Sequence, residues 1–109
     1  MDKILYKEKK IPNLGIILSY YFLVDTCQTD DLPISMETYG IEIEKRYDYE
    51  GVMYVQSKVA NEISCSERHM LYLLELLYQC SVTPVTLLDV IADLEEEGFF
   101  TRENECYSA

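Results

Sequence analysis

Hydrophobic and polar residues alternate with a period of two along Glu37–Gly51, which reads ETYGIEIEKRYDYEG. Tyrosines and isoleucines occupy the odd positions, and carboxylates occupy most of the even positions. Successive side chains of a β-strand point to opposite faces of the sheet. The pattern therefore predicts a strand with one apolar face and one acidic face.

Two further segments are expected to form strands. Leu14–Asp25 is rich in Ile, Val, Tyr and Phe, as a strand buried on one or both faces would be. Val52–Asn61 alternates again. The residues before it, Tyr47–Gly51, are adequate for a turn but lack the Asn-Gly signature of a tight two-residue hairpin. The three segments predict an antiparallel meander.

The apolar period changes to that of a helix after Ser64. Ser64 and Glu67 have the spacing of a capping box at a helix start. Thr83 and Pro84 predict a second helix, with an N-cap followed by proline at the first helical position. Gly98 is placed to end that helix. Four apolar residues recur on one side of the first helix: Met70, Leu73, Leu74 and Leu77.

These elements predict an α+β fold, in which a three-stranded antiparallel sheet carries a C-terminal helical hairpin on one face. The length of 109 residues fits one domain, 1–109. Residues 1–12 are basic and polar, and residues 101–109 are mostly polar, so both are expected to be mobile ends. Additional apolar residues on the first helix allow a homodimer.

The net charge of -11 limits the kind of partner. Binding to nucleic acid by phosphate neutralisation needs Lys and Arg, and an anionic membrane surface would repel this chain. A basic protein surface remains available as a partner. A purely solubilising role of the acidic residues is the alternative.

The cysteines and the N-terminus indicate a cytoplasmic protein. The four cysteines form no CxxC pair, and their spacing matches no zinc motif. The N-terminal residues lack the apolar core of a secretory signal, and no apolar run approaches the ~20 residues that span a bilayer. Reduced thiols in the cytoplasm are the simplest account.

No catalytic or metal-binding constellation is visible. Cys65 and His69 are four residues apart and could share a helical face, but zinc requires three or four ligands. No glycine-rich phosphate loop and no EF-hand spacing occurs. The sequence therefore predicts a non-enzyme with no metal and no cofactor, and a structural role for His69.

Three segments carry a resemblance to a known family: YYFLVD, YGIEIE and SVTPVTLLDVIADL. Together they resemble a family of small proteins of unknown function in low-GC Gram-positive bacteria, over about residues 20–94. The resemblance implies a fold and a bacterial host but no activity. In size and acidity alone, the chain is also similar to anti-CRISPR inhibitors from mobile elements. Such proteins often block a basic nucleic-acid channel.

The candidate binding residues form two acidic clusters with neighbouring tyrosines. Carboxylates at strand spacing form a row that Arg46 interrupts, and carboxylates at the end of the second helix oppose its macrodipole. Tyrosine suits an interface because it combines an apolar ring with a polar tip. The residues are Glu42, Glu44, Asp48, Glu50, Tyr47 and Tyr49 on the strand, and Asp93, Glu95, Glu96 and Glu97 on the helix.

We therefore expect a non-catalytic acidic inhibitor or regulator. Its predicted partner is a basic nucleic-acid-binding surface of another protein, in the manner of an anti-CRISPR protein that inhibits a Cas9-type nuclease. The alternative is a housekeeping protein–protein interaction module that uses the apolar helix face and is able to dimerise.

Overall fold

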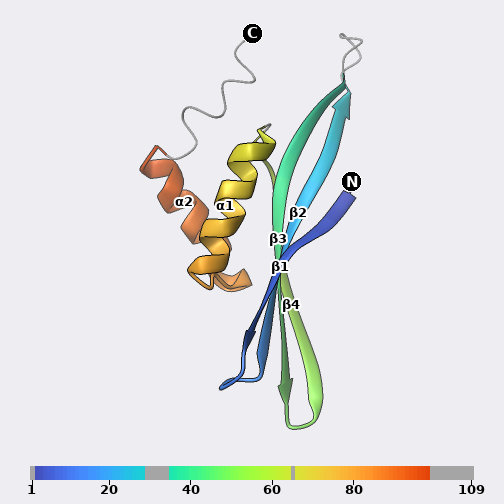
Figure 1. The fold of residues 1–109 in the computed structure, drawn as a ribbon, viewed down its shortest axis with the longest axis vertical. Helices are drawn as coiled ribbons and strands as arrows, with labels where there is room; N and C mark the ends of the chain where they lie inside the picture. The colour runs from blue at the N-terminus through green and yellow to red at the C-terminus, as the bar shows by residue number, and fades with distance from the viewer. Residues whose placement is uncertain (1, 29–34, 65, 99–109) are drawn as a thin grey trace.

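The computed structural model describes residues 2–28, 35–64 and 66–98 (Figure 1). These residues form four strands, two α-helices and one short 3-10 helix. The elements are β1 (Asp2–Ile11), β2 (Ile16–Gln28), β3 (Ser35–Tyr49), β4 (Val52–Ser64), α1 (Glu67–Gln79), η1 (Pro84–Thr86) and α2 (Leu87–Glu96). The predicted α+β class is confirmed.

The sheet is an antiparallel meander in the order β1-β2-β3-β4. The prediction of three strands was wrong, because residues 2–11, expected to be a mobile end, form β1 and pair with β2. The four lysines of β1 resemble a solvated tail in the sequence. An edge strand accommodates lysine well, however, because charged side chains discourage unwanted pairing of its free edge. The other predicted mobile end, 101–109, lies outside the described residues.

The β3–β4 connection is a tight hairpin. Tyr49 pairs with Val52, so the loop contains only Glu50 and Gly51. Both have positive φ, at 52° and 79° respectively. Positive φ at both loop positions defines a type I′ turn, the form that matches strand twist. The turn lies within the predicted range Tyr47–Gly51, but Glu50 occupies a position usually held by Asn, Asp or Gly, so its tight two-residue form was not expected.

The helices cover one face of the sheet, as expected, and the core lies between them (Figure 1). All four residues of the predicted stripe on α1 are fully buried: Met70, Leu73, Leu74 and Leu77. They pack against Leu18, Ile41 and Ile43 of the sheet. The Tyr20 hydroxyl donates to the Val82 carbonyl at 2.9 Å inside this core. Burial raises the pKa of Tyr20 to about 12, so the hydroxyl keeps its proton.

The helix ends differ in detail from the predictions. Ser66, not Ser64, is the N-cap of α1, and its hydroxyl accepts from the His69 amide at 3.2 Å. The Ser64 hydroxyl instead accepts from the Ser66 amide at 3.0 Å, because Ser64 is still part of β4. Pro84 begins a turn of 3-10 helix before α2. Gly98 follows the end of α2 with a φ of 79°, which confirms its predicted role.

The helices leave one end of the sheet bare. The molecule measures 54 × 29 × 18 Å, and the β1–β2 and β3–β4 turns extend well beyond α1 and α2 (Figure 1). We call this part the uncovered end. Several large apolar side chains are exposed there: Leu14, Tyr49, Val52, Met53, Tyr54 and Val55. Apolar side chains gathered in this way on a protein surface often mark an interaction site, whereas single scattered ones do not.

Gly40 allows β3 and β4 to approach closely at an irregularity in their register. The pairing shifts between Tyr39 and Ile41, and a Cβ atom on Gly40 would lie 2.5 Å from the backbone oxygen of Ala60. Since a backbone atom cannot move aside as a side chain can, Gly40→Ala is expected to lower the free energy of unfolding by about 1–3 kcal/mol. Urea denaturation measures the loss. Ser57→Ala, an exposed change in the same hairpin, is the control. Equal free energies of unfolding for the two variants would contradict the close approach of β3 and β4 at Gly40.

Candidate protein-binding surfaces

The predicted carboxylate row of β3 lies on the open face of the sheet. Ile41 and Ile43 point into the core, so Glu42 and Glu44, with the opposite parity, point away from the helices. Their neighbours across the sheet are Tyr21 and Ser19 on β2 and Val59 and Ser57 on β4. Glu42 and Glu44 are partly buried rather than projecting into solvent.

Basic residues of the same sheet form ion pairs with Glu42 and Glu44. Lys3 Nζ lies 2.8 Å from Glu42 Oε2, and this hydrogen bond raises the pKa of Lys3. Arg46 lies 3.4 Å from Glu44 and 3.2 Å from Glu8. Arg46 was visible in the sequence as an interruption of the row. The contribution of Lys3 was not, because β1 was not expected to be a strand.

Four of the predicted binding residues lie at the uncovered end. Tyr47 stacks on Tyr54 with ring centroids 5.4 Å apart, and Lys45 Nζ lies 5.2 Å from the centre of the Tyr47 ring. Tyr49 is well exposed. Asp48 and Glu50 are exposed beside it. Aromatic rings and carboxylates thus occur together there.

The helical acidic cluster is different because its carboxylates form no ion pair with any residue that the structure describes. Asp93, Glu95, Glu96 and Glu97 are all exposed. In the part of the chain that the structure describes, every ion pair involves the sheet or α1, and none involves α2. Asp89, in the first turn of α2, is a further exposed carboxylate that sequence analysis missed.

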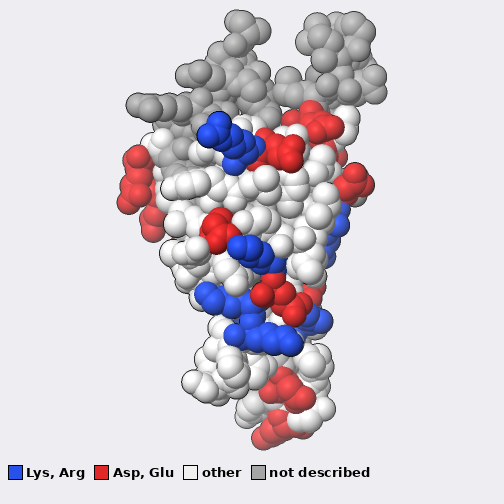
Figure 2. Space-filling model, viewed as in Figure 1, with Lys and Arg blue, Asp and Glu red and all other residues white. Residues whose placement is uncertain are grey.

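The carboxylates of α2 follow the repeat of the helix. Asp89, Asp93 and Glu97 are four residues apart, which places them on one side of the helix, about 6 Å apart along its axis. No Lys or Arg occurs between residues 69 and 98. Figure 2 shows carboxylates along the flank formed by α2, at the left of the view, whereas Lys and Arg gather lower down. We call Asp89, Asp93, Glu95, Glu96 and Glu97 the α2 acidic surface.

The two predicted clusters do not form one site. The β3 row lies on the open face, and α2 lies on the other side of the sheet (Figure 1). A single flat partner surface therefore cannot contact both clusters at once.

Glu75 of α1 holds β1 against the helix, a role that sequence analysis missed. Tyr6 Oη and Lys7 Nζ each donate to Glu75 Oε1 at 2.7 Å, and Gln79 Nε2 donates to Oε2 at 2.8 Å. The hydrogen bonds from Lys7, Tyr6 and Gln79 lower the pKa of Glu75 to about 2. Lys9 Nζ adds a further contact, to the carbonyl oxygen of Tyr78 at 3.0 Å.

The ionisation of Glu75 makes the free energy of unfolding depend on pH. Because the pKa of Glu75 is depressed by folding from 4.5 to about 2, its contribution is fully present above pH 4.5 and is lost between pH 4.5 and 2. We expect Glu75→Gln to lower the free energy of unfolding at pH 7 and to differ less from the parent at pH 2. Denaturant titrations across this range measure the difference, with the exposed Glu97→Gln as a control for lost charge. A pH-independent difference for Glu75→Gln would contradict the assignment.

The described residues form no candidate metal site. Within residues 2–28, 35–64 and 66–98, no cluster of three or more His, Cys, Asp or Glu side chains is arranged to hold a metal ion. His69 lies on α1, but Cys65, its sequence-predicted neighbour, lies outside the described residues. Cys80 is a free, exposed thiol at the end of α1. No helix in the described segments is long and apolar enough to cross a membrane.

These features define a small α+β protein whose four-stranded antiparallel meander carries two C-terminal helices on one face. The chain belongs to a family of unknown function, DUF6514, whose model matches residues 2–97. The match includes β1 as well as the segments that carried the sequence resemblance. The chain matches no curated protein and no solved structure.

Proposed function

We propose that this is a non-catalytic protein that binds a basic surface of another protein through the α2 acidic surface. The observation that carries the proposal is the contrast between the two clusters. Glu42 and Glu44 of β3 are paired with Lys3 and Arg46, whereas the α2 carboxylates have no ion-pair partner among the described residues. Unpaired carboxylates keep their full field and are the ones available to a partner.

The position of these carboxylates supports the same conclusion. The last turn of α2 contains no basic residue, although Lys or Arg would complement the negative end of the helix macrodipole. Each exposed anion at that end disfavours the helix by about 0.3–1 kcal/mol. Three successive glutamates therefore impose a cost on the fold, which binding to a basic partner would offset.

The partner that fits this chemistry is a protein with a basic groove for nucleic acid. We propose a Cas9-type nuclease, which the chain would inhibit by occupying the channel for guide RNA or DNA. The small size and net charge of -11 support this choice, and so does the uncovered end, where Tyr49 adds an aromatic face for arginine.

A second candidate surface is apolar. Tyr72 and Val85 are 64% and 76% exposed, and Leu88 is 47% exposed. These residues belong to α1, η1 and α2, and a partner that docks on them would make apolar contacts. An interaction module that uses this surface is the alternative function.

Affinity capture tests the proposal. The tagged chain is incubated at low salt with a lysate from a bacterium that contains a type II CRISPR system, and the retained proteins are identified by mass spectrometry. We expect a nuclease with a basic channel to be retained and to be released by moderate salt. Retention of basic proteins without the nuclease would refute the nuclease assignment. Retention that survives high salt would favour the apolar helical surface.

A further inference from the structure

Strand β4 is exposed on both of its faces, although it is part of the sheet. Residues 51–59 are all exposed. Met53 and Val55, at 59% and 57% exposure, lie on the open face. Val52 and Tyr54 lie on the helix-side face, beyond the reach of the helices. As the last strand of the meander, β4 also presents one row of backbone N–H and C=O groups that no described strand pairs.

The two edges of the sheet differ in how readily they would pair with a further strand. The β1 edge carries four lysines and an irregular register between Leu5 and Lys7, both of which discourage further strand pairing. Along Val52–Val59, by contrast, β4 has one lysine and no proline, and its register with β3 is unbroken. An apolar, regular edge of this kind is suited to accept another strand.

The distribution of charge favours β4 of a second copy as the strand that pairs with this edge. Two copies of a chain with a net charge of -11 repel each other over most of their surfaces. Val52–Asn61 contains no Asp or Glu and a single basic residue, Lys58. This segment is therefore one stretch along which two copies can approach without facing rows of carboxylates.

We propose that β4 pairs with β4 of a second copy, in antiparallel orientation, to form a continuous eight-stranded sheet. A two-fold axis perpendicular to the sheet relates the copies, so the helices of both lie on the same side. Such an interface is isologous and closed. The protected β1 edges then lie at the two ends of the assembly, which stops growth at the dimer.

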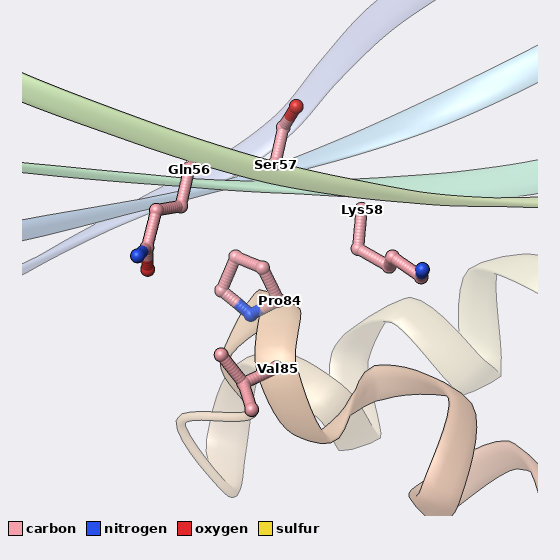
Figure 3. A pocket seen from close by; sticks show the side chains of 5 residues that line it. All are labelled: Gln56, Ser57, Lys58, Pro84 and Val85. Carbon is pink, nitrogen blue, oxygen red and sulfur yellow. The ribbon is translucent and has the colours of Figure 1, made fainter.

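A hollow beside β4 supports this arrangement. It has a volume of about 240 Å³ and is lined by Gln56, Ser57, Lys58, Pro84 and Val85. Figure 3 shows that Gln56 and Lys58 extend towards Pro84 and Val85, whereas Ser57 points to the opposite face. In an antiparallel pair centred near Gln56, the uncovered end of one copy lies beside η1 of the other. Tyr54 of the second copy then faces this hollow, which would bury the exposed Val85.

Sedimentation of the full chain tests the dimer. We expect a mass twice the chain mass of 12.7 kDa. The double variant Met53→Lys, Val55→Lys places charges on the proposed interface and is expected to sediment as a monomer. The double variant Tyr72→Lys, Leu88→Lys introduces the same charge on the helical side and is expected to remain a dimer. A monomeric parent, open filaments, or a dimer that survives the β4 change but not the helical change would overturn the proposal.

Hydrogen exchange of the unmodified chain tests the dimer independently of whether the variant folds. Edge-to-edge pairing should slow exchange of the β4 backbone amides as protein concentration rises, because dimerisation gives the outward-facing amides a partner. Exchange of β4 that is independent of concentration would overturn the proposal even if the variant fails to fold. Because neither measurement involves a basic partner, failure here leaves the proposed function standing, and the reverse also holds.

Discussion

Leu73→Ala is expected to lower the free energy of unfolding by about 2–5 kcal/mol. Leu73 is fully buried on the side of α1 that faces the sheet. It belongs to the core cluster that also contains Leu18, Ile41 and Leu87, so its truncation leaves a cavity in the core between α1 and the sheet. The remaining side chains fill such a cavity only in part, and the cost exceeds the transfer free energy of the deleted atoms.

Leu71→Ala provides the matched control, since Leu71 is in the same helix but 37% exposed. Its expected effect is below about 1 kcal/mol, as for most surface changes. Guanidinium denaturation monitored by circular dichroism measures both variants, and an unchanged slope with denaturant would show that only stability has changed. Comparable losses for the two variants would mean that α1 does not pack on the sheet as described.

Reversal of Glu95, Glu96 and Glu97 to lysine is expected to slow association with the basic partner by about 10–1000-fold at low salt. The change raises the net charge by six, from -11 to -5, and removes three exposed carboxylates at the end of α2. Stopped-flow mixing with the captured partner measures the rate at several salt concentrations. The difference from the parent should shrink as salt increases, because screening weakens the attraction of exposed charges.

A control variant separates the effect of charge on α2 from the effect of net charge on the association rate. Asp2, Glu8 and Glu67 are exposed carboxylates outside α2, and their reversal to lysine also gives a net charge of -5. If the α2 acidic surface makes the contact, this control should associate much faster than the α2 variant. Equal rates for the two variants would show that only total charge matters and would contradict a specific role for α2.

The periodic segments were predictable, and the edges of the sheet were not. The helical spacing of Met70, Leu73, Leu74 and Leu77 corresponds directly to the buried side of α1, because burial of one helix face imposes that spacing. The alternation around Ile41 and Ile43 corresponds in the same way to β3. In contrast, β1 was missed because an edge strand needs few apolar residues, and its lysines resemble a tail.

The site was harder to predict because ion pairs join residues distant in sequence. Glu42 looked like a free carboxylate, but Lys3, 39 residues away, lies against it. The role of Glu75 was not predictable, because its partners Tyr6 and Lys7 belong to the strand that was missed. The α2 carboxylates were identifiable from the sequence, because the absence of basic residues from 69 to 98 is visible there. Whether the predicted residues bind a partner remains a prediction.

The most direct test of the proposed function is competition for guide RNA. A purified Cas9-type nuclease is titrated with fluorescent guide RNA at low salt, with and without an excess of this chain, and anisotropy reports the bound RNA. We predict that the apparent Kd for guide RNA rises with the concentration of the chain. The chain with Glu95, Glu96 and Glu97 reversed to lysine should leave it unchanged. An apparent Kd that the unmodified chain does not alter at any concentration would contradict the account.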